Sequence, residues 1–409
     1  MGIRGENGRK GRGLASVLAV AVMMGLLSGC ATPTWTPSWI GGGKGGEKES
    51  ARFVSPDPGS KTGLRQVWNR SLAGSPDKHF VHPGRMALGR ESIFVGTFQG
   101  NVSRVDRKSG EVIWKVALGA AVMGGVGMDE TRVYAGTEQG AMVALSVDTG
   151  AELWRTRLTT AVDSAPLVVD GKVLFQTLDN RTHALDAQTG HRIWTHSTPS
   201  EVLVVMGSAT PAAAEGLAFI GYSSGEVFAL QLADGKRVWS DNLRVLGGSS
   251  ELDLMQDVDA SVVVSEARGP QLMSPRLVFV VNHQGRVMAS LASNGNRIWE
   301  KRLSAVRQPL WSSGRLFVVD MDGNLVAMSA EDGTELWRVR LSDGLLTSPV
   351  LYKERILVAD DQKHLFAIEP LSGRILGRDK LPGPVLSLPV VTEDGLYLWT
   401  NEGDLLRYE

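Results

Sequence analysis

The residues most suited to chemistry in this 409-residue chain are its histidines, and their spacing gives little support for a site. One close pair, His79 and His82, precedes a Pro-Gly turn and follows no helical period. A second pair, His191 and His196, has finger-like spacing, but no cysteine pair lies upstream to complete a zinc site. The chain also lacks a Gly-x-Ser-x-Gly elbow, a phosphate-binding loop and a calcium-loop pattern. We therefore expect no catalytic residues, no metal and no cofactor.

The single cysteine, Cys30, has a better-defined chemical setting. Four basic residues within positions 4–12 precede an apolar run over 14–27, and two small residues stand directly before the cysteine. This order is typical of a signal peptide, and the apolar run is shorter than the ~20 residues of a membrane span. The ending Leu-Ser-Gly-Cys resembles the bacterial lipobox, which implies cleavage before Cys30 and lipidation of its thiol. Ala31, which is not an Asp, fits delivery to the outer membrane.

A repeat of about 40 residues organises the rest of the chain. In each intact copy a Gly precedes a Trp by four residues within an apolar strand, and a second turn lies ten residues before that Gly. Two turns between short alternating segments are typical of propeller blades. Helical repeats would show a 3.6-residue period, and the sequence has none. A seventh copy has Gly377 in the Trp position. The intact copies end at Trp114, Trp154, Trp194, Trp239, Trp299 and Trp337.

The two ends of the chain complement each other. The final copy, which begins at Gly395, stops before its Gly-to-Trp strand, whereas a Trp-bearing strand over 64–68 lies before the first complete repeat. Docking that strand into the last blade closes the ring and removes free sheet edges. The sequence therefore predicts an all-β fold, an eight-bladed β-propeller of four-stranded blades in which an N-terminal strand completes the last blade.

Composition and charge define the domain plan and exclude one class of partner. We expect a lipoprotein signal peptide over 1–29, a lipidated flexible tether rich in Gly, Pro and Ser over 30–62, and one propeller over 63–409. Lys and Arg number 43 against 44 Asp and Glu. This balance lacks the basic excess that nucleic-acid binding would require.

Uneven repeat spacing shows where binding loops are expected. Successive Trp residues are usually 40 apart, but the interval is 45 from Trp194 to Trp239 and 60 from Trp239 to Trp299. The shorter insertion contains a mostly apolar segment over 200–206, and the longer one contains an acidic segment over 247–259 and continues to about residue 274. Loops on a rigid scaffold often carry binding function. Longer strand connections without a function explain the spacing equally well.

Recurring Asp and Trp residues are interpreted as structural. The Asp residues fall in or near the turns, where their side chains accept hydrogen bonds from the local backbone. The Trp residues supply large apolar surfaces for packing between blades. A carboxylate ring and a ligand-stacking ladder are the alternatives to these interpretations. The Asp residues are Asp106, Asp148, Asp186, Asp234 and Asp332.

The Gly-x-x-x-Trp repeats, as in 148–154 and 186–194, resemble those of the quinoprotein propellers, a family that includes quinone-dependent alcohol dehydrogenases. Those enzymes pair the cofactor with a vicinal disulfide, and this chain has no cysteine beyond Cys30. Nearly everything after Cys30 more closely resembles the BamB family, propeller lipoproteins of the outer-membrane β-barrel assembly (BAM) machinery. This resemblance implies a non-catalytic scaffold, lipid-anchored at the periplasmic face of the outer membrane. Its implied partners are the periplasmic domains of BamA, other BAM subunits and unfolded outer-membrane proteins.

The resemblance also implies a partner-binding site in the two inserted loops. Asp257 and Asp259 match an acidic signature of the family and would face basic groups of BamA. Leu203 and Val205 match a Leu-rich loop that supplies apolar contact, and Met206 stands where the family often has an Arg. The alternative is that both Asp residues brace their own loop.

Two other functions are compatible with a propeller of this kind. One is the binding of a quinone or a sugar, which a bound chromophore or ligand in the purified protein would indicate. The other is a scaffold of a different envelope complex, which a pull-down without BamA would favour.

Overall fold

We describe the fold from a computed structural model of the chain. The chain divides into two units, 1–49 and 50–409, and all described residues belong to the second. Among these residues we find no helix, and hence none long and apolar enough to cross a membrane. The description covers residues 60–73, 84–198, 209–243, 262–265, 275–282, 285–305 and 307–409.

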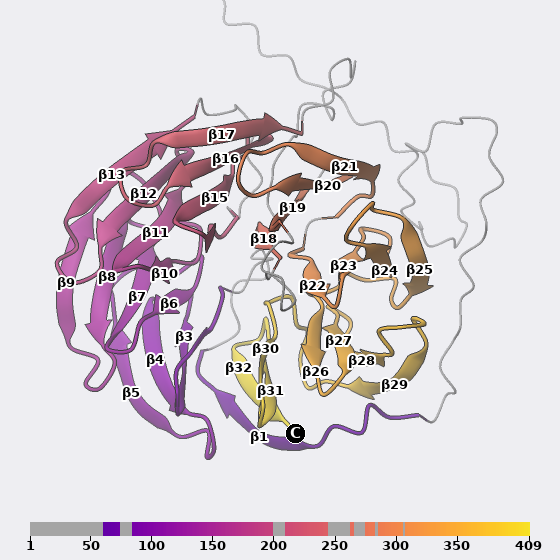
Figure 1. Ribbon diagram of the computed structural model, residues 1–409. Helices are drawn as coiled ribbons and strands as arrows, with labels where there is room; N and C mark the ends of the chain where they lie inside the picture. Colours follow the sequence, from indigo (N-terminus) through magenta and orange to yellow (C-terminus); the bar gives the residue numbers. More distant parts are fainter. Residues whose placement is uncertain are drawn as a thin grey trace, which may run out of the picture. The chain divides into compact units, whose positions relative to one another are not determined.

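The strands form eight antiparallel sheets of four, arranged as the blades of a ring (Figure 1). We number the blades 1 to 8 along the chain and call the four strands inner, second, third and outer, counted from the centre of the ring. This arrangement confirms the predicted eight-bladed propeller.

Blade 1 contains β2 (Ala87–Leu88), β3 (Ser92–Gly96), β4 (Asn101–Asp106) and β5 (Val112–Ala117), and blade 2 contains β6 (Val126–Met128), β7 (Arg132–Thr137), β8 (Ala141–Ser146) and β9 (Glu152–Arg157). Blade 3 contains β10 (Leu167–Val169), β11 (Lys172–Thr177), β12 (Arg181–Asp186) and β13 (Arg192–Ser197), and blade 4 contains β14 (Ala212–Ala214), β15 (Leu217–Gly221), β16 (Glu226–Gln231) and β17 (Arg237–Asn242). Blade 5 contains β18 (Val263–Val264), β19 (Leu277–Asn282), β20 (Arg286–Leu291) and β21 (Arg297–Arg302), and blade 6 contains β22 (Leu310–Ser312), β23 (Arg315–Val319), β24 (Asn324–Ser329) and β25 (Glu335–Arg340). Blade 7 contains β26 (Val350–Tyr352), β27 (Arg355–Ala359), β28 (His364–Ile368) and β29 (Ile375–Lys380), and blade 8 contains β30 (Val390–Thr392), β31 (Gly395–Trp399), β32 (Asp404–Tyr408) and β1 (Gln66–Ser71).

The middle strands of a blade are buried on both faces, and the outer strand is not. Every residue of β3 is buried, and its sequence Ser-Ile-Phe-Val-Gly is rich in the β-branched and aromatic residues that favour strands. In β9, by contrast, exposed residues alternate with the half-buried Trp154 and Thr156. Second and third strands lie between two neighbouring blades, so their apolar runs are nearly continuous. The outer strand shows the alternation expected when one face meets solvent.

Each pair of neighbouring blades encloses one hydrophobic cluster, eight in all among the described residues. The repeated Trp contributes to this packing and also donates a hydrogen bond from Nε1 to a carbonyl oxygen in the third-to-outer turn of the next blade, at 2.8–3.2 Å. The interpretation of the Trp residues as packing elements is thus confirmed. The donors and acceptors are Trp68–Arg107, Trp114–Val147, Trp154–Ala187, Trp194–Leu232, Trp239–Ala292, Trp299–Ala330 and Trp337–Pro370.

Most of the recurring Asp residues stabilise turns, as predicted. The Asp186 carboxylate, for example, accepts hydrogen bonds from the amides of Gln188 and Thr189 at 3.0 and 2.8 Å. Asp148 differs, because its carboxylate lies 3.7 Å from the guanidinium of Arg104. The residues that accept turn amides are Asp106, Asp186, Asp234 and Asp332.

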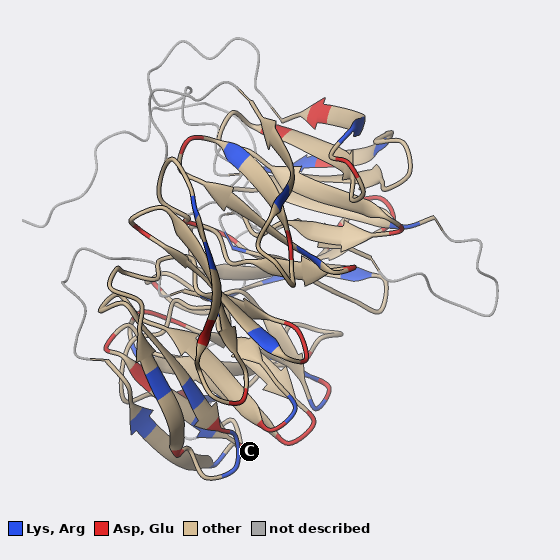
Figure 2. Ribbon diagram, turned by 90° about the vertical axis from the view of Figure 1, so that its left-hand side faces the viewer, with Lys and Arg blue, Asp and Glu red and all other residues tan. Residues whose placement is uncertain are grey.

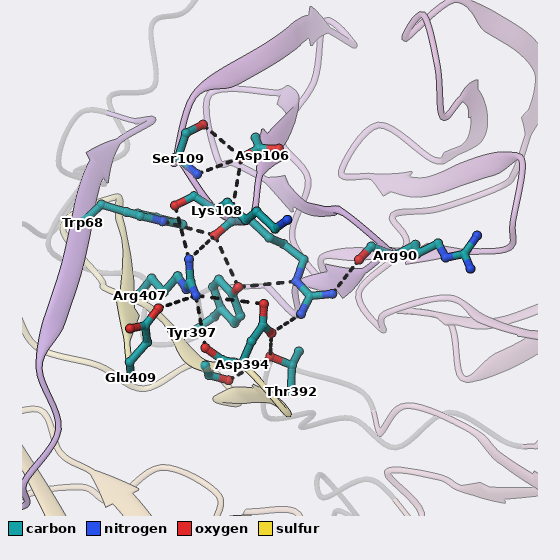
Figure 3. A network of polar contacts seen from close by, with 12 residues as sticks. Trp68, Arg90, Asp106, Lys108, Ser109, Thr392, Asp394, Tyr397, Arg407 and Glu409 are labelled. Atoms are coloured by element: carbon teal, nitrogen blue, oxygen red, sulfur yellow. Dashed lines mark hydrogen bonds and ion pairs between the residues drawn. The ribbon is translucent and has the colours of Figure 1, made fainter.

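The ring closes in blade 8, where β1 pairs with β32 from Gln66 opposite Tyr408 to Ser71 opposite Asp404, with one register shift between Gln66 and Trp68. The predicted closure by an N-terminal strand is therefore confirmed. The closing interface between blades 8 and 1 contains a network of polar contacts (Figure 3). The carbonyl oxygen of Arg107 accepts hydrogen bonds from Trp68, Arg407 and Tyr397 at 3.2, 3.1 and 3.4 Å. The guanidinium of Arg107 forms an ion pair with Asp394. The equivalent turn residues in the other blades are apolar: Val147, Ala187, Leu232, Ala292, Ala330 and Pro370.

Gly377 breaks the Trp pattern because the N-terminal chain passes over it. A Cβ built on Gly377 would lie 2.2 Å from the carbonyl oxygen of Lys61, so no larger side chain fits. Blade 8 also has no turn between its third and outer strands, since β32 and β1 come from opposite ends of the chain. A Trp at this position would therefore have neither room nor the usual hydrogen-bond acceptor.

The longer insertion is two loops rather than one. The inner strand β18 lies between them and pairs with β19, with Val263 opposite Phe279. One loop, 243–262, precedes β18 and connects blades 4 and 5; the other, 265–276, joins two strands of blade 5 at the opposite face. The predicted single insertion was wrong in this respect, because a two-residue strand leaves no periodicity to detect.

Candidate partner-binding surface

None of the predicted site residues falls within the described residues. Cys30, Leu203, Val205, Met206, Asp257 and Asp259 all lie outside them. The structure does describe where the two inserted loops leave and rejoin the propeller, at Thr198 and Ala209 for the first and at Leu243 and Val262 for the second.

The described residues at which the two loops leave and rejoin the propeller lie on the same face of the ring. Every outer strand runs in the same direction and leads to the inner strand of the next blade, so all these connections share one face. The connections 198–211 and 243–262 are longer than most of their equivalents, and they flank a single blade, blade 4 (Figure 1). A third long connection, 72–86, leads into blade 1, and we did not predict it because no complete repeat precedes it. The equivalent short connections are 118–125, 158–166, 303–309, 341–349 and 381–389.

A polar network holds the strand from which the first loop leaves. The Tyr222 hydroxyl lies 2.8 Å from both Thr182 Oγ1 and His196 Nδ1, and it thereby joins blades 3 and 4 below the loop. Thr198, the last residue before the loop, accepts a hydrogen bond from Asn180 Nδ2 at 2.9 Å. Asn180 has a positive φ of 59°, which Asn tolerates better than most residues.

Burial sets the ionisation of this network. Desolvation raises the pKa of Tyr222 and lowers the pKa of His196. The positive charge of Arg237 lowers the pKa of His196 further. Both side chains are therefore held neutral near pH 7, and the tyrosine bridges two uncharged partners. A neutral network is the arrangement that a buried interface between blades tolerates best.

An ion pair holds the strand from which the second loop leaves. Arg297 of blade 5 binds both carboxylate oxygens of Asp241 in blade 4, at 2.8 and 3.1 Å, and also the carbonyl oxygen of Asn242 at 3.2 Å. The amide of Leu243 then donates to the carbonyl of Gly225 at 2.9 Å. A bidentate Arg–carboxylate pair fixes geometry as well as charge. The loop over 244–261 thus starts from a strand end that two blades position together.

The histidines that the structure describes form no ligand group. His183 stacks on Phe175 and lies between the hydroxyls of Thr177 and Thr195, with burial lowering its pKa to about 4. His191 is exposed in a turn, apart from the buried His196 network. Within the described ranges no group of His, Cys, Asp and Glu is placed to hold a metal.

One pocket lies on the face opposite the two loops, between blades 1 and 2, and has a volume of about 780 Å³. Its lining includes Leu88, Met128, Arg90 and Arg104. The Arg104 guanidinium donates to Ser92 Oγ at 2.8 Å and to the carbonyl of Val147, in the next blade, at 2.9 Å. Arg104 therefore serves the packing of the two blades.

The sequence signals for the loop anchors were available but not specific. Tyr222, Asp241 and Arg297 each occupy an ordinary repeat position, and polar residues at such positions usually meet solvent. Only the packing of blade 5 against blade 4 brings Arg297 to Asp241, 56 residues earlier in the chain.

Comparisons with known proteins agree with one another. The family described as outer membrane protein assembly factor BamB matches residues 98–328 and 321–409. The BamB of Pseudomonas aeruginosa is 36% identical over 352 residues, 84% of this chain and 89% of that protein. The BamB of Legionella pneumophila is 26% identical, and that match spans about half of each chain, 51% and 52%.

Solved structures show the same fold. The crystal structure of BamB from Moraxella catarrhalis superposes with a TM-score of 0.75 at 23% identity. The match covers 85% of this chain and 99% of that one. A quinohemoprotein alcohol dehydrogenase from Pseudomonas putida superposes with a TM-score of 0.67 at 13% identity over 85% of this chain and 76% of that one. At such identities the likeness concerns the propeller alone. The match of the family over most of the ring, together with the Pseudomonas relative, shows that the chain belongs to the BamB family of outer membrane protein assembly factors, with a propeller of the quinoprotein type.

Proposed function

We propose that the chain is a non-catalytic scaffold subunit of the outer-membrane β-barrel assembly machinery, which binds the periplasmic domains of BamA and aids the folding and insertion of outer-membrane β-barrel proteins. The observation that carries this proposal is the pair of long connections, 198–211 and 243–262, on one face beside blade 4 in a chain of the BamB family. A rigid ring with two neighbouring long loops suits the binding of a protein partner.

The two loops would make different contributions to that contact. Leu203, Val205 and Met206 provide an apolar segment whose burial supplies affinity. Asp257 and Asp259 provide charges that orient a basic partner surface and accelerate association. Because the anchors of both loops are fixed by blade-to-blade contacts, little ordering of the scaffold is needed on binding.

The proposed anchor places this scaffold at the membrane. Lipidation of Cys30, after removal of a signal peptide over 1–29, would hold the protein at the periplasmic face of the outer membrane. The segment 30–62 would then join the lipid to the propeller over 63–409, with BamA, the other BAM subunits and client proteins on the same side of the membrane.

Binding of the Cys30→Ser chain to the periplasmic domains of BamA from the same cell tests the proposal. The test variant is Asp257→Lys with Asp259→Lys, and the matched control is Asp322→Lys with Asp343→Lys. The control makes the same charge change at exposed residues of the same face, in a turn of blade 6 and in the connection between blades 6 and 7. Circular dichroism and thermal unfolding must show that all three proteins are folded.

We expect the native chain and the control to bind and the test variant to lose most of its binding. Equal loss in both variants would indicate a diffuse electrostatic effect and would overturn the assignment of Asp257 and Asp259. Absence of binding by the native chain would overturn the BamA proposal itself and would favour a scaffold of another complex.

A further inference from the structure

The N-terminal chain joins the propeller at a defined place on its rim. The carbonyl oxygen of Ser60 accepts a hydrogen bond of 3.1 Å from the backbone amide of Arg378, on the free edge of β29. The Thr62 hydroxyl donates to Asp379, and Arg355 Nη1 donates to the Thr62 carbonyl at 2.8 Å. Gly377 leaves the room that this crossing requires. Everything that precedes Ser60, including the proposed lipid site, is therefore connected to the outer edge of blade 7.

Basic side chains gather around this point. The segment 60–65 and the stretch 374–380 contain five basic residues and one acidic residue, Asp379. All five basic residues are exposed, with 76% and 65% of the Arg65 and Arg374 side chains accessible. The five residues, which we call the seam cations, are Lys61, Arg65, Arg374, Arg378 and Lys380.

Few carboxylates compensate the seam cations. Arg65 pairs with Glu409 and Arg374 contacts Glu369, but Lys61, Arg378 and Lys380 have no ion pair within the described part of the chain. Asp379 is partly buried and accepts the Thr62 hydroxyl. Arg378 and Lys380, two residues apart on β29, point to the same face of the strand. Their charges therefore add at one surface.

The charge of the whole rim favours the same kind of partner. The eight outer strands together contain 13 Lys and Arg but only 5 Asp and Glu, although the complete chain has a formal charge of −1. Figure 2 shows basic segments along these strands and many acidic segments in the turns. The rim as a whole is basic, and the seam cations are the part of it to which the N-terminal chain is attached.

We infer that the seam cations form a surface that contacts anionic phospholipid headgroups of the membrane to which the chain is tethered. This inference rests on the proposed lipid anchor for the identity of the membrane. Ser60 follows Cys30 by 30 residues, which span about 100 Å when fully extended, so the lipid confines the propeller to that distance and raises the effective concentration of headgroups around it. Basic residues near an anionic surface each add to binding, within a Debye length of about 8–10 Å.

The arrangement of the ring leaves the proposed BamA surface free. Blade 4, which the two long connections flank, lies four blades from blade 8 in either direction around the ring (Figure 1). The membrane contact at blades 7 and 8 and the protein contact at blade 4 are therefore on opposite sides. Both contacts can form at the same time without sharing a residue.

The test is co-sedimentation of the Cys30→Ser chain with vesicles of phosphatidylethanolamine and phosphatidylglycerol at a 3:1 ratio, at low and at high salt. Vesicles of phosphatidylcholine provide the uncharged comparison. The seam variant is Lys61→Glu with Arg378→Glu and Lys380→Glu. The corresponding alanine variant provides a second test if the charge reversal disturbs folding.

The matched control carries the same charge change elsewhere on the rim, as Arg157→Glu with Arg192→Glu and Arg237→Glu. These arginines are exposed on the outer strands of blades 2, 3 and 4, and none has an ion pair within the described ranges. The seam variant and the control therefore have equal net charge. Binding to the periplasmic domains of BamA is measured on both.

We expect the native chain to bind the anionic vesicles at low salt, and the seam variant to bind roughly 100-fold more weakly, from three lost cations. The control is expected to change less than threefold, and high salt should abolish native binding. Equal weakening in both variants, or no preference of the native chain for anionic vesicles, would overturn the inference. Binding of the seam cations to an acidic protein in place of the vesicles would also overturn it. Retained BamA binding by the seam variant separates this result from any failure of the proposed function.

Discussion

Gly190 of blade 3 lies against the indole of Trp154 in blade 2, so closely that a Cβ on the glycine would be 2.6 Å from Cε3 of the ring. The same glycine has a φ of +72°, which L residues rarely adopt. Two separate physical demands therefore fix glycine at the most regular position of the repeat. One demand is the shape of the turn, and the other is the approach of the neighbouring blade.

Alanine substitutions separate these two demands. Gly171 also has a positive φ, of +68°, but a Cβ there would meet nothing within 4 Å. We expect Gly171→Ala to lower the free energy of unfolding by about 1 kcal/mol, the cost of the left-handed conformation. Gly190→Ala should cost about 1–3 kcal/mol more, because the indole must shift. Denaturant unfolding of both variants measures the difference, and equal losses would show that the Trp contact has no energetic role.

Removing the Tyr222 hydroxyl should weaken the contact between blades 3 and 4. Tyr222→Phe leaves Thr182 Oγ1 and His196 Nδ1 without their 2.8 Å partner, and we expect a loss of about 1–3 kcal/mol in unfolding free energy. Tyr352 provides the control, because its buried hydroxyl has no hydrogen-bond partner within the described residues. Tyr352→Phe should therefore change stability by less than about 0.5 kcal/mol. Similar losses in the two variants would contradict the prediction.

Stability should fall on mild acidification through His183. Burial lowers its folded pKa to about 4, whereas an unfolded histidine titrates near 6.5. The neutral form is favoured in the fold, so this contribution is complete above pH 6.5 and is lost as the pH falls from about 6.5 to 4. The loss amounts to roughly 3 kcal/mol.

Unfolding free energies measured between pH 7 and pH 4 for the native chain and His183→Gln test this prediction. The variant should show a shallower decline with falling pH, whatever its absolute stability. His191→Gln, at an exposed turn position, should leave the native slope unchanged. A native slope that persists in His183→Gln would show that other groups cause the pH dependence.

A methyl group on Gly377 should release the N-terminal chain from the rim. The Cβ of Gly377→Ala would collide with the Lys61 carbonyl oxygen, and the φ of this residue is not in the left-handed region, so the effect is purely steric. We expect faster trypsin cleavage after Lys61 and Arg65 and a loss of about 1–3 kcal/mol. In the control, Gly383→Ala, the new atom would meet the flexible end of Glu402 at 3.1 Å, and cleavage should stay slow.

The regular part of the ring could be predicted because its signals are local. A Gly and a Trp four residues apart define a turn and the strand that follows it, and six copies of that pair, with a seventh that has Gly377 in the Trp position, indicate a ring. The exceptions depend on contacts between distant segments. Nothing near Gly377 reveals that Lys61 occupies the space of the missing side chain. Likewise, the two-residue strand β18 is too short to produce a periodicity, so the sequence showed one insertion where the structure has two.

One exception to the repeat is visible in the sequence itself, at the third-strand position opposite the Trp. The third-strand residue opposite the Trp position is Arg104 in blade 1 and Arg407 in blade 8, whereas blades 2 to 7 have alanine. Both arginines donate to carbonyl oxygens in the turn of the next blade, at 2.9 and 3.1 Å. Large charged residues at an alanine position therefore mark the two blades that meet at the closing interface, blades 1 and 8. The alanines are Ala144, Ala184, Ala229, Ala289, Ala327 and Ala367.

The partner-binding residues were a different case. Their prediction came from family resemblance, and their loops lie outside the described residues, so Leu203, Val205, Met206, Asp257 and Asp259 stay predictions, as does lipidation of Cys30. The structure shows how the described strand ends from which these loops leave are fixed, by Tyr222 for the first loop and by Arg297 for the second.

The pairing of β1 with β32 also determines when the fold can be completed during synthesis. Gln66 is made early and must wait for Tyr408, the second-to-last residue of this chain, before it gains its partner. Blades 1 to 7 each consist of consecutive residues and can assemble in order as the chain emerges, whereas β1 stays unpaired until β32 has been synthesised. The first seven blades therefore form an open arc, and the ring is sealed only when β32 pairs with β1.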